Sequence, residues 1–372
     1  MLNLAFSFLI AFLGTLGIVH YAHLHEKFST DHDLDGVQKF HVRPVPRVGG
    51  VGIVLGALGA ALLLLFRYPW FAGQTLILLA CAAPAFGAGF VEDVTKRVSP
   101  RARLFWTMVA ALLASVVMGI RIERVDIPAL DPLFAFVPLS IAFTVVAVAA
   151  LANAINIIDG FNGLASMVAT LMFISMAYVA FKLGDALVLT IAFIMIGAIL
   201  GFFAWNYPFG LIFLGDGGAY FIGFMLAELA ILLVVRHPEV SAWYPVLMFI
   251  YPIFEVIFSI YRRRFIKGSP PDQPDSHHLH TLIYKRVMRW AVGSRNAAAL
   301  TRRNSFTSPY LWMLCLAAVL PATLFWRYTW VLVGCVCLFV LFYVWLYTCI
   351  VKFRTPRWLI FRRHAQPRHR KS

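Results

Sequence analysis

Amide and carboxylate side chains are concentrated in the segment from Asn153 to Leu164, between two long apolar runs. Asn153, Asn156, Asp159 and Asn162 recur every three residues, and such groups are costly to place against lipid. Asparagine and aspartate also cap helices, but one cap needs one such residue. Side-chain amides can bind a ring edge, a sugar hydroxyl or a metal ion through oxygen. We therefore expect a wet, protein-lined site here.

Two further motifs carry acids. Glu92 and Asp93 are adjacent, so they stay ionised together only beside a metal, a proton-donating nucleophile or basic partners, although a solvated helix end with salt bridges has the same pattern. Asp216 lies among glycines, and a helix that starts there would direct its amides at an anion such as phosphate. Mg²⁺ uses one or two protein oxygens together with substrate phosphates, which fits Asp216; an N-cap after a glycine turn is the alternative.

Basic and imidazole side chains form the remaining motifs. Lys39, His41 and Arg47 lie in a loop stiffened by two prolines and could meet phosphate oxygens. His278 and His280 lie in the longest basic loop, with no cysteine and no third histidine at a spacing that would favour zinc. Phosphate binding or proton relay by these imidazoles is the favoured interpretation, with a surface histidine cluster as the alternative.

Composition then defines the elements that must position these residues. Hydrophobic residues make up 61% of the chain and charged residues 13%, and apolar windows long enough to cross a core of ~30 Å recur. The five cysteines fall inside such windows, where burial explains them better than a disulfide or zinc site. We predict an all-α polytopic fold with about eleven transmembrane helices, the first a retained span. These are residues 2–23, 48–66, 75–91, 104–120, 133–151, 164–181, 186–204, 218–235, 244–261, 309–326 and 329–351.

The basic residues predict the orientation. Three loops, 24–47, 92–103 and 262–303, and the tail from Lys352 hold 26 of the 32 Lys and Arg residues. Cytoplasmic segments are enriched in these residues, so we expect the N-terminus outside and the C-terminus in the cytoplasm. The net charge of +15 then reflects topology and attraction to anionic membrane lipids, and no nucleic acid is needed as a partner.

This topology predicts one transmembrane catalytic domain over residues 1–351 and a basic cytoplasmic tail over 352–372. Every polar motif falls in a predicted cytoplasmic loop, and these loops are 24–47, 92–103, 152–163, 205–217 and 262–308. A transporter of nucleotide sugars or lipid-linked sugars would more often place polar residues near the bilayer midplane or show a repeat. A scaffolding protein would not need acids, amides and histidines on one side. One-sided clustering therefore favours an enzyme acting on a cytosolic substrate and a lipid.

Taken together, the motifs resemble those of the polyprenyl-phosphate N-acetylhexosamine-1-phosphate transferases, membrane enzymes of the glycosyltransferase family 4 type. The resemblance runs from about residue 33 to 285. In the family's order the chain has Lys-x-His with Pro-x-Pro-Arg-x-Gly-Gly, an acidic pair followed by Arg-Leu, Asn-x-x-Asn-x-x-Asp-Gly-x-x-Gly-Leu, Gly-Asp-x-Gly and Pro-Asp-x-x-His-Leu-His.

The resemblance implies an activity and a setting. Undecaprenyl phosphate would attack a UDP-N-acetylhexosamine, giving the lipid diphosphate sugar and UMP, at the cytoplasmic face of a bacterial inner membrane. This step would initiate O-antigen or other cell-envelope polysaccharide assembly. Mg²⁺ is the implied cofactor, with Mn²⁺ as a substitute. A homodimer is compatible with the sequence, because lipid-facing and partner-facing apolar helices look alike.

The resemblance also assigns roles to residues. Asp216 would bind the metal, and Asn156 would join it. Asp93, with Glu92, would engage or deprotonate the lipid phosphate. The remaining residues would bind phosphates or the nucleotide, or order the site; the histidines among them are also catalytic candidates. They are Lys39, His41, Arg47, Arg103, Asn153, Asp159, Asn162, His278 and His280.

Two positions depart from the family pattern. Glu92 and Asn162 each stand where aspartate is usual, which makes Asp93 the safer acid and suggests a neutral contact at Asn162. The His-Leu-His form differs from the triple histidine of the muramoyl-pentapeptide branch. We therefore favour the surface-polysaccharide branch and keep the peptidoglycan branch as the alternative.

Overall fold

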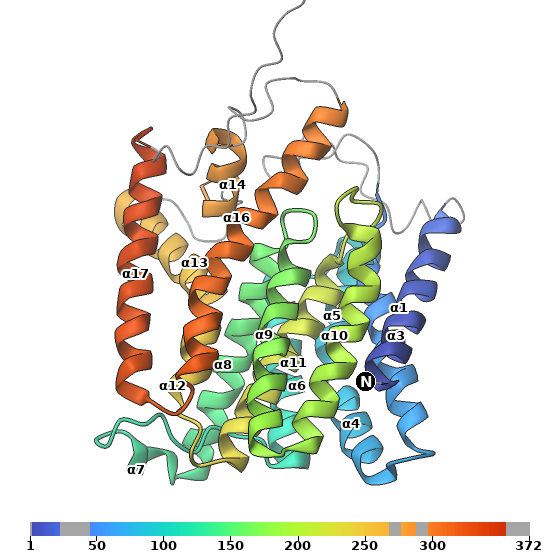
Figure 1. Ribbon diagram of the computed structural model, residues 1–372, viewed down its shortest axis with the longest axis vertical. Helices are drawn as coiled ribbons and strands as arrows, with labels where there is room; N and C mark the ends of the chain where they lie inside the picture. The colour runs from blue at the N-terminus through green and yellow to red at the C-terminus, as the bar shows by residue number, and fades with distance from the viewer. Residues whose placement is uncertain (1, 23–44, 268–276, 288–296, 355–372) are drawn as a thin grey trace, which may run out of the picture.

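The protein is a bundle of α-helices (Figure 1). The computed structural model describes residues 2–22, 45–267, 277–287 and 297–354, and these ranges contain no β-strand. The longer helices are α1 (Leu2–His20), α3 (Gly49–Leu64), α4 (Pro69–Cys81), α5 (Ala83–Thr95), α6 (Pro100–Met118), α8 (Val137–Ile158), α9 (Leu164–Leu183), α10 (Ala186–Asn206), α11 (Gly215–Arg236), α13 (Ile250–Tyr261), α16 (Ala297–Leu324) and α17 (Thr329–Val351). The short elements are α7 (Asp131–Phe134), α12 (Trp243–Met248), α14 (Leu279–Leu282) and the π-helical turns η1 (Arg262–Lys267) and η2 (Ile283–Val287).

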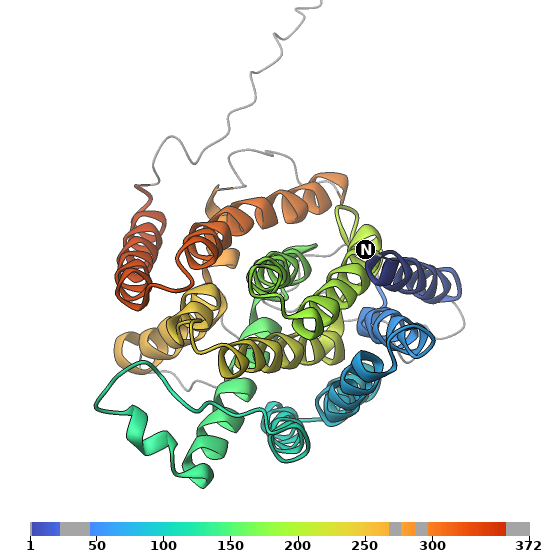
Figure 2. The ribbon, with the colours of Figure 1, turned by 60° about the horizontal axis from the view of Figure 1, so that its bottom comes forward.

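Helix α11 occupies the middle of the bundle. In its most apolar window 89% of the residues are buried, compared with 17% in α1 and 22% in α17. It packs against α3, α5, α8 and α9, and Figure 2 shows it enclosed by other helices. Outer helices leave large apolar side chains such as Leu13 and Leu341 exposed. Because such extensive apolar surface is unfavourable in water, these faces are suited to lipid.

Each predicted span coincides with helical structure, which confirms the all-α polytopic class. Within the described ranges, eight helices are long and apolar enough to cross a membrane, and α4 with α5 forms a ninth candidate bent by 46°. Helix α3 is apolar but has only 16 residues, and the span expected at 244–261 is divided at Phe249 into α12 and α13. The count of eleven and the orientation stay predictions.

Three predicted loop boundaries were wrong, because polar residues continue the helices. Glu92 and Asp93 belong to the end of α5, Asn153 and Asn156 lie on α8, and residues 297–308 belong to α16. Hydropathy windows end a span where polar side chains begin, yet these side chains find partners inside the protein. The helix can therefore extend beyond its apolar window.

Local signals then bring the polar segments to one end of the bundle, at the top of Figure 1. Glycines with positive φ precede two of the helices there, Gly163 before α9 and Gly215 at the start of α11. These conformations are costly for residues with a Cβ and allow the chain to reverse sharply. Helix α6 starts in the same region, where the Ser99 hydroxyl accepts the N–H of Ala102.

Candidate active site

The carboxylate of Asp216, in the first turn of α11, lies at the centre of the polar cluster. It forms an ion pair with Arg103 of α6, and one of its oxygens lies 3.7 Å from Arg47, just before α3. The amide of Asn156 on α8 donates a hydrogen bond to the same oxygen at 2.9 Å. The Asp216 side chain is 12% exposed. Four segments that are distant in sequence therefore meet at one carboxylate.

Asp93 fixes the start of α11 from the neighbouring helix α5. Its two oxygens accept the backbone N–H groups of Asp216 and Gly217 at 2.8 and 2.9 Å. A carboxylate at a helix N-terminus satisfies donors that the helix itself leaves unpaired. In this structure two of the first amides of α11 therefore bind a carboxylate of the protein itself.

Glu92 turns in another direction. Its carboxylate accepts the N–H of Val98 at 2.7 Å, which closes the turn between α5 and α6. The adjacent acids thus do not face one another: one orders the connection to α6, which carries Arg103, and the other orders α11.

Close helix contacts hold these elements together. A Cβ added to Gly89 of α5 would lie 2.5 Å from the backbone nitrogen of Gly217, and one added to Gly50 of α3 would lie 2.4 Å from Gly218. Such distances are shorter than any normal carbon contact, so only glycine fits. The backbones of α3 and α5 can therefore approach the first turn of α11 directly.

Asn153 and Asn156 lie one helical turn apart on the same face of α8. Asn153 accepts a hydrogen bond from the hydroxyl of Tyr220 at 3.2 Å, and the ring of Tyr220 lies 5.9 Å from the guanidinium carbon of Arg103. Asn156 contacts Asp216 directly. The two amides thus line the wall of the cluster that α8 provides.

Asn162 connects the turn after α8 to α16 and is only 2% exposed. Its backbone N–H donates to the side chain of Asn304 at 2.9 Å, and its amide donates to the Ser305 hydroxyl at 3.3 Å. Ser308 donates to its carbonyl at 2.6 Å. This geometry favours the ordering role over substrate contact. Of these partners, sequence reasoning missed Asn304, Ser305 and Ser308, whose signal is a polar stripe at the start of an apolar helix.

Glu255 of α13, which sequence reasoning also missed, holds the histidine segment. One of its oxygens lies 3.0 Å from Nδ1 of His278 and accepts the N–H of Leu279 at 2.9 Å. The hydroxyl of Tyr343 donates to the other oxygen at 2.7 Å. An isolated carboxylate in an apolar run was the signal that could have revealed Glu255, because such a group needs a partner.

His278 and His280 stack on one another, with ring centroids 5.2 Å apart and planes inclined by 10°. The ring of His280 meets the edge of Phe161 at 5.5 Å. This contact brings the histidine segment beside the asparagine-rich turn, as its assignment to the same site requires.

Asp159 lies in the turn between α8 and α9, outside the membrane-spanning helices. Burial raises the pKa of Asp159 to about 7, and the charge of Arg47 opposes this rise only in part. A carboxyl group with this pKa changes charge within the physiological range, which is common at functional sites.

The structure therefore brings most of the predicted residues to one end of the bundle, and their individual roles stay predictions. Lys39 and His41 lie outside the described residues. Among the residues described, no three His, Cys, Asp or Glu side chains gather as a metal cluster. Asp216 and Asn156 nevertheless provide a carboxylate and an amide side by side. This pair fits Mg²⁺, which commonly takes few protein oxygens and completes its shell with water and substrate phosphates.

Fold and site together define a polytopic helical membrane protein with a charged site at one end of its bundle. Residues 75–234 match the family model described as glycosyl transferase family 4. Sequence relatives extend further along the chain. A protein of Bacillus subtilis (strain 168) named "Probable undecaprenyl-phosphate N-acetylglucosaminyl 1-phosphate transferase" is 27% identical over 263 residues, 69% of this chain and 70% of that protein.

Two other relatives show the breadth of the similarity. The undecaprenyl-phosphate alpha-N-acetylglucosaminyl 1-phosphate transferase of Thermotoga maritima is 28% identical, covering 68% of this chain and 72% of that protein. A phospho-N-acetylmuramoyl-pentapeptide-transferase of Streptococcus thermophilus is 43% identical, but only over 84 residues, 23% of this chain and 25% of that protein. The similarity to glycosyl transferase family 4 therefore covers residues 75–234, less than half of the chain.

Proposed function

We propose that this protein transfers N-acetylhexosamine 1-phosphate from a UDP-sugar to undecaprenyl phosphate, releasing UMP. The observation that carries the proposal is the Asp216 carboxylate held between Arg47, Arg103 and Asn156 at one end of a membrane bundle. The names of the relatives from Bacillus subtilis and Thermotoga maritima support this reaction, and they make UDP-N-acetylglucosamine the first donor to test.

The two arginines provide the phosphate-binding groups. Guanidinium groups match phosphate oxygens well, and Arg103 is well suited because its Nε is buried and has no hydrogen-bond partner among the described residues. When a nucleotide diphosphate enters, these donors can turn from Asp216 to its oxygens. Their charge would stabilise the UMP that departs.

Mg²⁺ is the proposed cofactor, held by Asp216 with Asn156. When bound, such an ion neutralises the diphosphate and stabilises the charge of the leaving group.

The acceptor phosphate needs little activation. A phosphate monoester has a second pKa near 6 and is largely ionised at neutral pH. One of its oxygens forms a bond to the β-phosphorus of the nucleotide sugar, while the bond from that phosphorus to the UMP oxygen breaks. We propose that Asp93 serves this step by positioning α11, since both of its oxygens accept backbone N–H groups.

The histidine segment would complete the substrate cavity. His278 is oriented by Glu255, and the stacked His280 faces the asparagine-rich turn through Phe161. Two oriented imidazoles can donate hydrogen bonds to phosphate oxygens or transfer protons. Asp159 and Asn153, on the other side, would contact the nucleotide or order its pocket.

We propose that the site faces the cytoplasm of a bacterial inner membrane, with the N-terminus outside. The strong excess of Lys and Arg in the sequence segments 24–47, 92–103 and 262–303 and in the tail from Lys352 supports this orientation. A cytoplasmic site would meet the UDP-sugar directly, while the lipid phosphate approaches from the bilayer. The product would start a cell-envelope polysaccharide such as O-antigen.

A decisive experiment incubates the purified protein with undecaprenyl phosphate, Mg²⁺ and a panel of UDP-sugars and measures UMP. The panel includes UDP-N-acetylglucosamine, and the similarity to the Streptococcus thermophilus enzyme justifies adding UDP-N-acetylmuramoyl-pentapeptide. UMP release that requires the lipid supports the proposal, and the accepted donor identifies the branch. No release with any N-acetylated donor would contradict it.

A further inference from the structure

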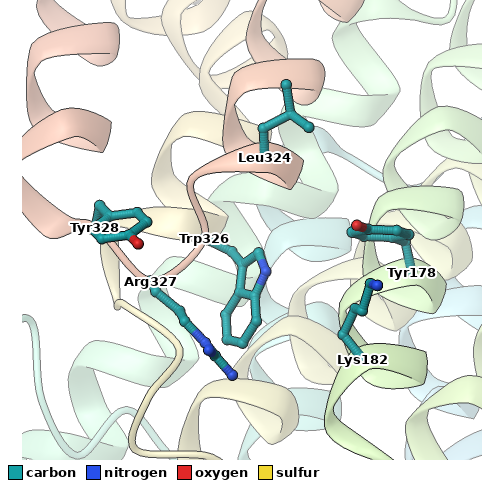
Figure 3. Close-up of a pocket in the computed structure, with 6 residues that line it drawn as sticks. All are labelled: Tyr178, Lys182, Leu324, Trp326, Arg327 and Tyr328. Atoms are coloured by element: carbon teal, nitrogen blue, oxygen red, sulfur yellow. The ribbon is translucent and has the colours of Figure 1, made fainter.

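A second candidate site lies at the end of the bundle opposite to Asp216. It is a cavity of about 300 Å³ lined by Tyr178, Lys182, Leu324, Trp326, Arg327 and Tyr328 (Figure 3). Helix α9 links the two ends, because it begins just after the asparagine-rich turn and carries Lys182 in its last turn. At a rise of 1.5 Å per residue, its 20 residues separate the ends by about 30 Å. The cavity is therefore distinct from the candidate active site.

The charges in this cavity differ from those around it. In the part of the chain that the structure describes, six Lys and Arg residues lie in or beside the helix connections at this end of the bundle. Within the described residues, three pair with carboxylates: Arg121 with Glu123, Arg124 with Asp126 and Arg236 with Asp185. The other three, Arg67, Lys182 and Arg327, form no ion pair with the residues described, and two of them line this one cavity. No Asp or Glu is among its lining residues.

Aromatic rings hold the two cations without neutralising them. The guanidinium carbon of Arg327 lies 4.3 Å from the centroid of the Trp326 ring, and Nζ of Lys182 lies 5.6 Å from that of Tyr178. In Figure 3 the indole of Trp326 is drawn between the two basic side chains. Trp326 is held in place at the base of the cavity, because it is only 8% exposed and its carbonyl accepts the N–H of Ser241 at 3.0 Å.

Two cations that share a small cavity repel one another. An anion bound between them attracts both and offsets this repulsion. Arginine and lysine bind phosphate oxygens, the former through two parallel hydrogen bonds. Tyrosine and tryptophan are enriched where helices meet the membrane surface, and the exposed Leu324 and Tyr328 continue the cavity wall with apolar surface. The combination matches an anion attached to a hydrocarbon chain.

We propose that this cavity binds the phosphate group of an anionic phospholipid from the leaflet on that side. Its size, near the lower end for ligand pockets, suits a headgroup rather than a whole nucleotide. Lys182 and Arg327 hold the phosphate, Trp326 supports it from below, and the acyl chains extend over Leu324 into lipid. A bound lipid there would join the end of α9 to the junction between α16 and α17.

The test uses the full chain, delipidated in a neutral detergent, with dihexanoyl phosphatidylglycerol as the probe. Its binding is followed by isothermal titration calorimetry for wild type, Arg327→Gln, Lys182→Gln and the double variant. Arg67→Gln is the matched control, since Arg67 is an exposed cation at the same end that also lies over a tyrosine ring. Each cation near an anionic lipid contributes enough binding free energy to change the affinity about fivefold.

We expect Arg327→Gln and Lys182→Gln each to weaken binding about fivefold, the double variant to weaken it about 25-fold, and Arg67→Gln to leave it unchanged. Arg327→Lys should retain most of the affinity, and melting without lipid verifies that each variant folds. Equal binding by Arg67→Gln and Arg327→Gln would overturn the proposal, as would equal binding of the zwitterionic dihexanoyl phosphatidylcholine. Saturation by inorganic phosphate at the same concentrations would overturn the lipid source and assign the cavity to free phosphate.

Discussion

Aspartates meet arginines at both ends of the bundle, but the two ends use them differently. Asp185, at the start of α10, caps its own helix by accepting the N–H groups of Leu187 and Val188 at 3.1 Å. Its other oxygen accepts hydrogen bonds from Arg236 at 2.6 Å and from His237 at 2.9 Å. Its side chain is completely buried. Both carboxylate oxygens of Asp185 are therefore used to hold the start of α10 to the end of α11.

Asp216 differs from Asp185 because it does not cap its own helix. Asp93 caps α11 in its place, so the partners of the Asp216 carboxylate within the described residues are side chains: it pairs with two arginines and accepts a hydrogen bond from one amide. Side chains can rotate away when a ligand arrives, whereas backbone N–H groups cannot. The comparison indicates that the site end is built to exchange partners and the far end to keep them.

We expect the largest loss of activity from a substitution at Asp216. Asp216→Asn keeps the size of the side chain but removes the charge that faces Arg103 and the proposed metal. We expect UMP release to fall by about 10³-fold with little change in melting temperature. Asp185→Asn in the same assay is the control from the far end, and equal losses for the two variants would remove the distinction between the ends.

Close packing of glycines at the site end gives the next prediction. Gly89→Ala places a methyl group against the backbone of Gly217, so α5 and α11 must separate. We expect roughly 10²-fold lower activity and a loss of about 3 kcal/mol in unfolding free energy. Gly87→Ala is the matched control on the same helix, because a Cβ there meets nothing within 4 Å. If both variants behave alike in activity and denaturation assays, the close approach of the helices is unimportant.

Glu255→Gln tests whether the site extends to the histidine segment. A glutamine amide cannot accept from His278, Leu279 and Tyr343 as the carboxylate does, so we expect activity to fall roughly tenfold. Tyr343→Phe removes only the donor to the second oxygen and should have a smaller effect. Steady-state UMP assays at varied donor concentration measure both. A larger loss for Tyr343→Phe would mean that packing, and not the orientation of His278, controls this region.

At the far end, Asp185→Ala should lower stability without changing the chemistry. Loss of the helix cap costs about 1–2 kcal/mol, and UMP release below the melting temperature should stay at the wild-type level. Hydrogen bonds from Arg236 and His237 outweigh burial and lower the pKa of Asp185. Its contribution is therefore present above the ordinary aspartate pKa and is lost as pH falls through the lowered value. The difference in melting temperature between wild type and variant should accordingly shrink below pH 4, and a constant difference would contradict this account.

Asp159 is expected to change stability with pH, because burial raises its pKa to about 7. Because the folded state holds this proton more tightly than the unfolded chain, the associated stability is present below pH ~4. It is lost as pH rises towards 7. Asp159→Asn cannot ionise, so its melting temperature relative to wild type should increase between pH 5 and pH 8. A parallel pH dependence for the two proteins would show that Asp159 does not titrate in this range.

The sequence pointed to many of the residues that meet in the candidate site, because their signals are local. Asp216 stands out by its glycines, Asn153 and Asn156 by their spacing, and the histidines by their proximity. Sequence reasoning misjudged where helices end, since a hydropathy window cannot detect that polar residues such as Asn304 have partners inside the protein. It also passed over Glu255, which looks like a single acid in an apolar run until His278 is placed beside it.

The sequence by itself determined the helical membrane class, the approximate positions of the spans and the grouping of polar motifs on one side. These properties depend on apolar content and charge summed over neighbouring residues, and neighbours are known without a structure. Only the tertiary structure decided that Asp93 caps a helix that starts more than a hundred residues later and that Lys182 and Arg327 share a cavity. Such pairings depend on how helices pack, which is set by many contacts across the bundle and not by any local pattern.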